Sequence, residues 1–338
     1  MSLAILGASG KLGFATLSAL LDRDLISPKD IICTTSSDSG AKKLDQARQK
    51  GVTIKRADWD NAATFESAFQ GCSKLFIISS SRIQKDFHDA AEGSGRESDH
   101  YVALEAAKNA GVKHVYYTSL AFLNPSKSRV MKAHERTEAW LTENWTGDGR
   151  NWTVIREGLY NESWPLYMGH WKVGEDDRTD VPIAGDSRIS WTSISDLGLA
   201  TALVLTAPSA EWAGKTFYLS QSTAHTLTEV ASMVAQAIDR PQIRISLVPR
   251  EQHEDYYVSQ RGMEAPYVKW WAKTYDALND HECEIKDATL EKLLKSQNVK
   301  PTPMEETVRA MCGASTGNTG SFIADGRRAD GVSQASRE

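Results

Sequence analysis

Short apolar runs alternate with helical segments through the first half of the chain. The helical segments keep small or apolar side chains on one face, as Leu12, Thr16, Ala19 and Leu20 do. The runs are rich in Val, Ile, Leu and Tyr, and most are too short for helices: Leu3–Leu6, Ile31–Thr35, Val52–Lys55, Leu75–Ser79, Val115–Thr118 and Trp152–Arg156. This alternation predicts a doubly wound α/β fold, with a parallel sheet covered by helices on both faces.

The rhythm changes after about Tyr160. A stretch containing Trp and Pro comes first, a strand-like run follows at Arg188–Thr192, and later stripes predict helices around one more strand, Thr216–Leu219. We therefore expect an α/β domain over residues 1–160 and a smaller α+β lobe over 161–312. Some elements of this lobe return to the first sheet. Gly, Ser, Ala and charged residues dominate the end of the chain and predict a disordered tail over 313–338.

Composition and charge narrow the classes of function. The formal charge of −5 argues against direct nucleic-acid binding, which needs a net basic face. No apolar run approaches the roughly 18 residues of a transmembrane helix, and no signal peptide is evident at the amino terminus. The four cysteines lack metal-binding or redox spacing, so we expect no metal and reduced thiols, with Cys33 buried in a strand. These features predict a cytoplasmic protein.

A glycine-rich loop follows the first predicted strand. Gly7 permits a tight turn, Gly10 lets the backbone approach a pyrophosphate, and Gly13 lets the next helix pack closely on the strand. Free N–H groups and the helix dipole would then meet the phosphates. The spacing is GxxGxxG rather than GxGxxG, but its place between a strand and an amphipathic helix favours a dinucleotide site in a Rossmann-type domain.

The end of the second predicted strand bears on the choice between NADP(H) and NAD(H). An acid at this tip would bind the ribose 2′-hydroxyl of NAD(H), whereas hydroxyl and basic groups suit a 2′-phosphate. Here the tip carries hydroxyls at Ser36 and Ser37, and Lys42 and Lys43 follow one turn later. Asp38 works against a phosphate, and the lysines also fit a solvated helix face. We expect NADP(H) to be preferred, with NAD(H) as the alternative.

Several segments in a fixed order resemble one family. The chain is similar to the NmrA-like group of atypical short-chain dehydrogenases, and within it to type-2 NAD(P)H:quinone oxidoreductases and their fungal relatives. The resemblance spans the chain to about residue 311. It is carried by Gly7–Gly13, Ala57–Asp60, Lys74–Ser81, Ala106–Lys113, Tyr117–Leu120, His134–Glu138, Arg156–Glu162 and Thr226–Val230.

The resemblance implies an NADP(H)-preferring fold with the nicotinamide near the ends of strands four to six. One position departs from the family, because relatives often carry an Arg after the second strand where this chain has Ser36. The cofactor contacts that the resemblance implies are Gly7, Ser9, Gly10, Lys11, Leu12, Gly13, Ser36, Ser37, Asp58, Ser79, Ser80, Ser81, Thr118, Gly158, Leu159 and Tyr160.

The chemistry at the nicotinamide departs from typical short-chain dehydrogenases. These enzymes use a Tyr-x-x-x-Lys pair for proton transfer, and this chain has none at the required offset. Many NmrA-like relatives place a lysine where this chain has His134, and an imidazole can donate or relay a proton near neutral pH. We expect His134 and Tyr160 to orient or protonate substrate oxygens. An exposed helix residue is the alternative for His134.

An aromatic stretch follows the sixth predicted strand. Tyr160, Trp164, Tyr167 and Trp171 could form a flat apolar lid over a ring-shaped substrate, or they could pack between the two lobes. With the resemblance, this stretch suggests substrate contacts at Tyr117, Asn161 and Trp164.

Two functions of different classes follow from the resemblance. The first is an NAD(P)H-dependent oxidoreductase that transfers hydride to a quinone or related aromatic carbonyl, in one version within fungal aromatic polyketide metabolism. The second is a non-catalytic NAD(P)-sensing regulator of the NmrA type, which acts through a protein partner. The segments at Tyr117–Ser119 and His134–Glu138 favour the enzyme. Whether the protein forms a homodimer is open.

Overall fold

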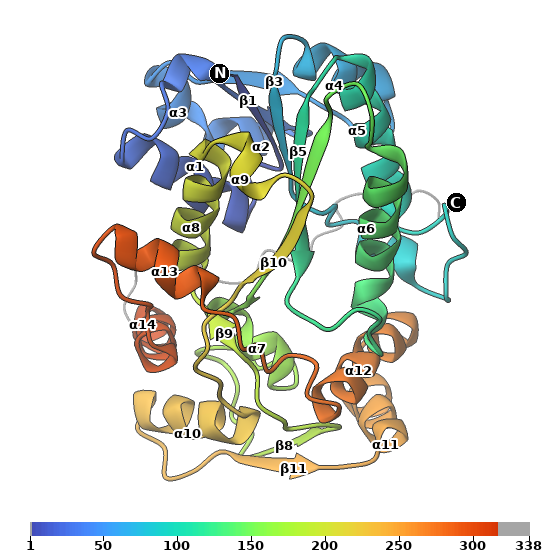
Figure 1. The fold of residues 1–338 in the computed structure, drawn as a ribbon. Coiled ribbons are helices and arrows are strands. Elements are labelled where there is room, and N and C mark those ends of the chain that lie inside the picture. The colour runs from blue at the N-terminus through green and yellow to red at the C-terminus, as the bar shows by residue number, and fades with distance from the viewer. Residues whose placement is uncertain (1, 317–338) are drawn as a thin grey trace, which may run out of the picture.

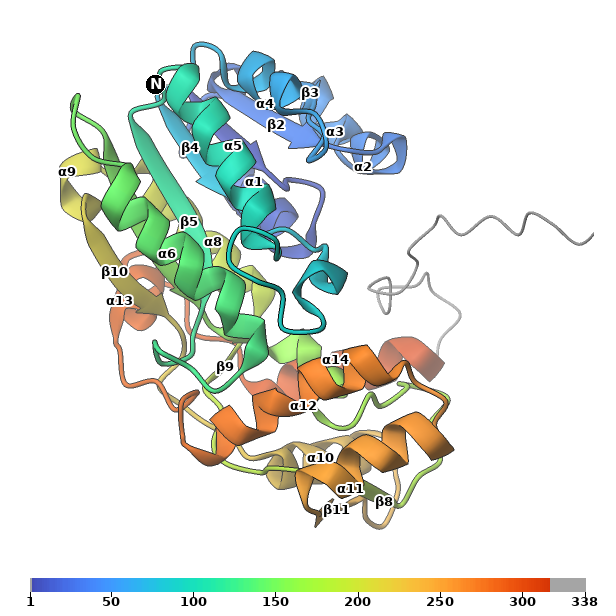
Figure 2. The same ribbon diagram turned by 90° about the vertical axis from the view of Figure 1, so that its right-hand side faces the viewer.

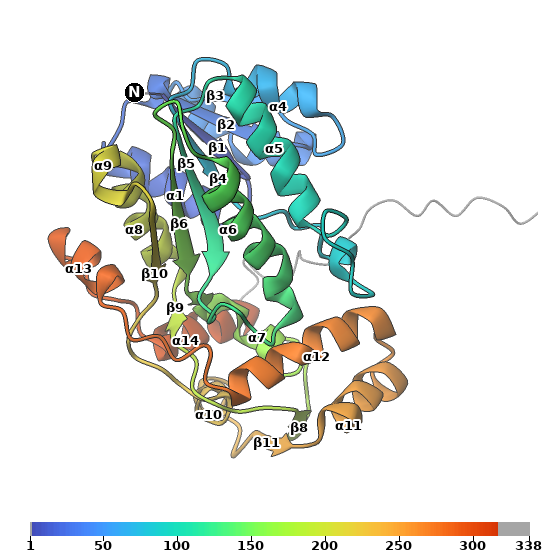
Figure 3. The same ribbon diagram turned by 45° about the vertical axis from the view of Figure 1, so that its right-hand side comes forward.

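The computed structural model describes residues 2–316 and divides into two stacked parts (Figures 1 and 2). A seven-stranded sheet with flanking helices forms the upper part of Figure 1. A smaller lobe lies beneath the carboxyl ends of the strands, toward which the arrow of β5 points (Figure 3). This is the expected α/β fold with a second lobe.

The large sheet is entirely parallel, with the order β10-β6-β5-β4-β1-β2-β3. The order reverses beside β1, which is where doubly wound sheets bind ligands. The first two strands match the predicted ranges, and the next four differ from them by one or two residues at an end. The strands are β1 (Leu3–Leu6), β2 (Ile31–Thr35), β3 (Thr53–Arg56), β4 (Lys74–Ile77), β5 (His114–Leu120), β6 (Asn151–Glu157) and β10 (Lys215–Leu219).

Helices cover both faces of the sheet because each presents an apolar stripe to it. On one face, α1 (Lys11–Asp22) packs on α8 (Ile194–Thr206), where Gly198 leaves no room for a side chain against Ala15. The short helices α2 (Asp38–Lys43), α3 (Asp45–Gln49), α9 (Ser209–Trp212) and α13 (Thr289–Ser296) lie around this layer. The other face is covered by α4 (Ala62–Phe69), α5 (Glu97–Asn109) and α6 (Lys132–Asn144).

The second lobe has its own core but exchanges elements with the first part. Helix α8 and strand β10 follow residue 160 in sequence and yet complete the first sheet and its cover. The strand expected at Arg188–Thr192 shrinks to the two residues of β9. The lobe contains β7 (Leu159–Tyr160), β8 (Asp180–Ile183), β9 (Trp191–Thr192), β11 (Arg244–Leu247), α7 (Trp164–Tyr167), α10 (Leu227–Ala237), α11 (Arg250–Asp255), α12 (Ala265–Asn279) and α14 (Met304–Thr316).

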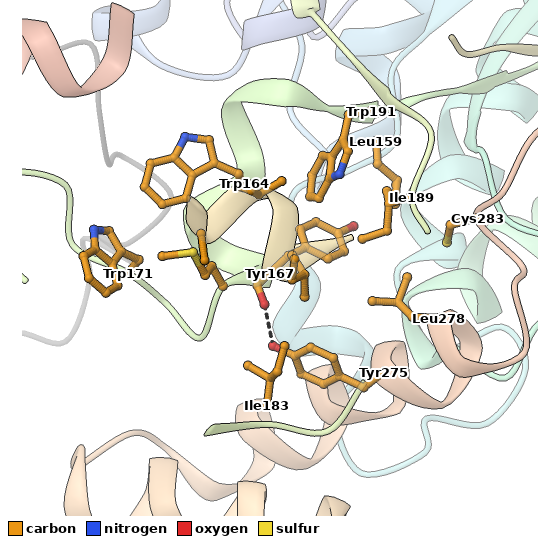
Figure 4. Close-up of a cluster of buried hydrophobic side chains, with 14 of the residues drawn as sticks. Leu159, Trp164, Tyr167, Trp171, Ile183, Ile189, Trp191, Tyr275, Leu278 and Cys283 are labelled. Carbon is orange, nitrogen blue, oxygen red and sulfur yellow. Dashed lines mark hydrogen bonds between the residues drawn. The ribbon is translucent and has the colours of Figure 1, made fainter. Parts of the chain in front are cut away.

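Three rings of the aromatic stretch after β6 lie in that core: Trp164, Tyr167 and Trp171 (Figure 4). Trp164 is fully buried, and Tyr167 and Trp171 are nearly so. Tyr167 packs edge-on against Trp191 and Trp271, and its backbone carbonyl accepts a hydrogen bond of 2.8 Å from the Tyr275 hydroxyl. In this structure these three rings pack within the second lobe, whereas the two alternatives for the stretch were a lid over substrate and packing between the lobes.

The sequence expectations for the cysteines, for membrane helices and for the tail can be compared with the structure. All four cysteines are free thiols and buried, and Cys33 lies in β2 as expected. No helix within residues 2–316 is long and apolar enough to cross a membrane. The tail expected over 313–338 lies outside the described residues from 317 onward, and its first four residues belong to α14.

Candidate functional site

The glycine loop joins the carboxyl end of β1 to α1. It lies at the point of the sheet where the strand order reverses. Gly7 has φ of +89°, a left-handed conformation that favours glycine, and Ile78 lies against it directly after β4. A Cβ atom at Gly13 would come within 2.3 Å of the Gly7 carbonyl oxygen. Gly7 and Gly13 are therefore required by the packing of the loop itself.

Gly10 differs from these two glycines because its surroundings are open. A Cβ atom there would meet only the Gly7 carbonyl oxygen, at 3.3 Å, and Gly10 and Lys11 are exposed. Among the described residues no side chain caps α1, whose N-cap is Gly10. The first turn of this twelve-residue helix thus has no side-chain cap for its N–H groups. This arrangement fits a pyrophosphate, whose oxygens accept such bonds.

The tip of β2 lies beside this loop. The Thr35 hydroxyl is 3.5 Å from that of Ser9, and the Ser37 hydroxyl accepts the Gly40 N–H at the start of α2. Ser36 and Ser37 are both exposed. The structure therefore brings the expected ribose-binding residues together with the loop that would hold the phosphates.

Two loops, one after β3 and one after β4, are joined at the carboxyl ends of these strands. The hydroxyl of Thr64 accepts a hydrogen bond of 2.8 Å from the Asp58 N–H. Arg82 follows the exposed Ser81 and forms an ion pair of 2.8 Å with Asp60. The ion pair joins the loop of Asp58 to that of Ser79–Ser81, so these expected contacts share one side of the site.

A buried chain of hydrogen bonds ties β4, β5, α5 and α6 together. The Ser80 N–H donates to Nε2 of His100 at 2.9 Å, and the Ser79 N–H donates to the Thr118 hydroxyl at 3.0 Å. The Tyr117 hydroxyl lies 2.9 Å from Nδ1 of His134 and 3.4 Å from Nδ1 of His100. Expected site residues from three elements therefore meet in one network.

His134 lies inside this network and not at the surface. Its side chain is 1% exposed, and its ring also hydrogen-bonds with the Thr118 backbone. Burial, together with the positive charge of Arg96, holds the pKa of His134 well below its usual range, and the pKa of His100 is lowered in the same way. Burial also raises the pKa of the Tyr117 hydroxyl. All three groups are consequently neutral at physiological pH.

The segment after β6 carries the remaining expected residues. A Cβ atom at Gly158 would come within 2.4 Å of the Thr192 hydroxyl, so glycine is needed there. Tyr160 is partly buried and packs against the hydrophobic cluster beneath α1 and α8. Desolvation and the Glu157 and Glu162 carboxylates raise its pKa. Asn161 is fully buried, donates to the Thr307 hydroxyl at 3.0 Å, and leaves Oδ1 without a partner among the described residues.

The chain matches one family of known proteins. The model described as the NmrA-like family matches residues 1–307, nearly the whole of the described chain. The chain belongs to the NmrA-like family. Quinone oxidoreductase 2 of Escherichia coli is 30% identical to this NmrA-like protein over 230 residues, which are 68% of the chain and 72% of that protein.

Two other relatives come from a fungus and a bacterium. The NmrA-like family domain-containing oxidoreductase flvB of Aspergillus flavus is 30% identical over 208 residues, 61% of this chain and 62% of its own. The solved triphenylmethane reductase of Citrobacter sp., complexed with NADP(H), has a TM-score of 0.74 and 25% identity, and the match covers 92% of this chain and all of that one.

One similar solved structure is a quinone oxidoreductase bound to NADPH. The NADPH-dependent quinone oxidoreductase of Escherichia coli, complexed with NADPH, has a TM-score of 0.73 and 25% identity, and the match covers 91% of this chain and 99% of the solved one. These relatives are oxidoreductases by name, and two are solved with the same class of cofactor.

Sequence reasoning missed several polar residues around the site of this NmrA-like protein. His100 and Asp99 lie on the buried side of the first turns of α5, and Glu157 is a buried carboxyl at the end of β6. Arg56 ends β3 beside the tip of β2. One signal was available in the sequence, because Glu97, Asp99 and His100 are polar residues close together at the start of a helix that must cover the sheet.

Proposed function

We propose that this NmrA-like protein is an NADP(H)-dependent oxidoreductase that transfers hydride to a quinone or a related aromatic carbonyl. The observation that carries the proposal is the open mouth of the glycine loop at Gly10, where an uncapped helix start faces the carboxyl edge of the sheet. The NADP(H) complexes of two similar reductases support the choice of cofactor.

The residues of this chain would hold NADP(H) along that edge. The backbone of the loop, from Gly7 through Ser9, Lys11 and Leu12 to Gly13, would bind the pyrophosphate. Ser36, Ser37, Asp58 and Ser79–Ser81 surround the adenosine side. Thr118 and Gly158–Tyr160 flank the other end. When bound, the cofactor supplies the hydride from its nicotinamide ring.

We assign different roles to the two residues expected to act on the substrate. Tyr160 is partly exposed at the end of β7, so its hydroxyl would orient a substrate oxygen. His134 is buried and neutral, so it would act as a positioning residue that fixes Tyr117 and Thr118. A quinone needs little proton assistance, because its ring is already electrophilic and orientation supplies much of the rate.

The three residues expected to contact substrate are all fully buried: Tyr117, Asn161 and Trp164. We propose that they support the substrate region from beneath.

We also propose that the protein acts in the cytoplasm, in fungal aromatic polyketide metabolism. The similar oxidoreductase of Aspergillus flavus supports a fungal source for this chain.

The test is NADPH oxidation by the purified protein, without oxygen, against a panel of quinones and aromatic carbonyls. We expect turnover with at least one quinone.

In the same assay Tyr160→Phe should lower kcat by about 10-fold or more. His134→Ala should lower kcat, and His134→Gln, which can still hydrogen-bond Tyr117, should recover part of it. Tight NADPH binding with no turnover on any acceptor would contradict the enzyme and favour the regulator.

A further inference from the structure

A guanidinium lies at the tip of β2, where the sequence shows no basic residue. Arg56 is the last residue of β3 and pairs in register with Thr35, the last residue of β2. Its Nη1 forms an ion pair of 2.7 Å with Oδ1 of Asp38, which begins α2. The side chain therefore reaches from β3 to α2 past the Ser36–Ser37 turn.

The position of Arg56 is set by strand pairing. The Ala57 N–H donates to the Thr35 carbonyl at 3.1 Å, so the parallel ladder continues to the ends of both strands. Residues paired in register send their side chains to the same face of a sheet. The Thr35 side chain faces Ser9 of the glycine loop, so Arg56 leaves the sheet on the face where the cofactor's phosphates are proposed to lie.

Exposure and charge make this guanidinium available to a ligand. The side chains of Arg56 and Asp38 are 58% and 92% exposed, so their ion pair contributes little to folding. A planar guanidinium presents paired donors that match a phosphate. Asp38 is the one acid at the tip that could accept hydrogen bonds from a ribose diol, and its Oδ1 lies against the Arg56 guanidinium.

We propose that Arg56 is the residue that selects NADP(H) over NAD(H) in this protein. It would bind the 2′-phosphate from β3, in place of the arginine that relatives carry at the position of Ser36. It would also keep Asp38 from recognising an unphosphorylated ribose. The inference rests on the proposed function, because it requires that a nicotinamide dinucleotide binds along this edge.

The test is the affinity of the full chain for NADPH and for NADH, measured by quenching of tryptophan fluorescence. Arg56→Gln should weaken NADPH binding about 10- to 100-fold, the effect of losing a charged hydrogen bond. It should leave NADH binding unchanged or tighter, because Asp38 is released. Asp38→Asn should tighten NADPH binding, and Arg56→Lys should recover part of the affinity. Raised salt should weaken NADPH binding to the wild type more than to Arg56→Gln.

Lys50→Gln is the matched control. It removes one positive charge from the same domain. Lys50 lies just before β3, at the amino end of the strand, and pairs there with Asp22. Both affinities should then equal those of the wild type. An unchanged NADPH-to-NADH ratio in Arg56→Gln would overturn the role of Arg56 and leave the proposed function intact. A wild type that binds neither dinucleotide would overturn both.

Discussion

Gly10→Val is expected to abolish NADPH and NADH binding while leaving the protein folded. The backbone at Gly10 has φ of −78° and ψ of 170°, an extended conformation that valine adopts readily, and a Cβ atom there meets only one atom at 3.3 Å. The new side chain would occupy the mouth of the loop where the pyrophosphate must approach the backbone. We expect an affinity loss of at least about 100-fold, with a stability cost of about 1 kcal/mol or less.

Gly13→Ala is the matched contrast. A Cβ atom there would come within 2.3 Å of the Gly7 carbonyl and 2.8 Å of the Ile78 side chain, so this variant should lose much of its stability as well as its binding. Thermal unfolding and fluorescence titration of both variants separate the two effects. NADPH affinity that survives in a folded Gly10→Val would show that the cofactor does not lie over this loop.

Glu157→Gln is expected to stabilise the protein in alkaline solution. Burial raises the pKa of the Glu157 carboxyl from 4.5 to about 8, and the Thr201 hydroxyl, at 2.9 Å, is its one hydrogen-bond partner within the described residues. The neutral acid therefore favours the folded state below about pH 4.5. This contribution falls as the pH rises and is lost above about pH 8, because the unfolded chain ionises first. The amide keeps the shape and the hydrogen bond but cannot ionise.

The difference between wild type and variant isolates this one group. Chemical unfolding should show similar stabilities near about pH 5 and an advantage for Glu157→Gln of several kcal/mol near about pH 9. Glu66→Gln, at an exposed position on α4, is the control and should show no such divergence. A gap between wild type and Glu157→Gln that stays constant with pH would mean that the Glu157 carboxyl is not held neutral by the fold.

The sequence predicted the frame of the site well because that frame depends on local patterns. β1 is a continuous apolar run that ends at Gly7, β2 is an apolar run that ends in two threonines before Ser36, and the structure has both strands over the predicted residues. The glycine loop was recognisable because a turn, a close approach and a helix start each impose glycine at a fixed spacing.

The polar partners of the site could not be predicted in the same way. His100 meets Ser80 and Tyr117 through folding of segments about twenty residues apart, and nothing in the local sequence encodes that contact. Arg56 approaches Asp38 only through the register of β2 and β3. The aromatic stretch was ambiguous because a lid and packing between lobes require the same apolar rings, and only the tertiary structure shows that Trp164 and Tyr167 pack within the second lobe.

The most direct test of the central claim is a single-turnover measurement with NADPH deuterated at one or the other face of C4 of the nicotinamide. The claim predicts that oxidation of enzyme-bound NADPH requires the quinone, and that it slows several-fold with one of the two labels and not with the other. Such a result would show that the protein presents one face of a bound cofactor to the acceptor. Equal rates with both labels, or loss of NADPH that does not depend on the quinone, would contradict hydride transfer in this site.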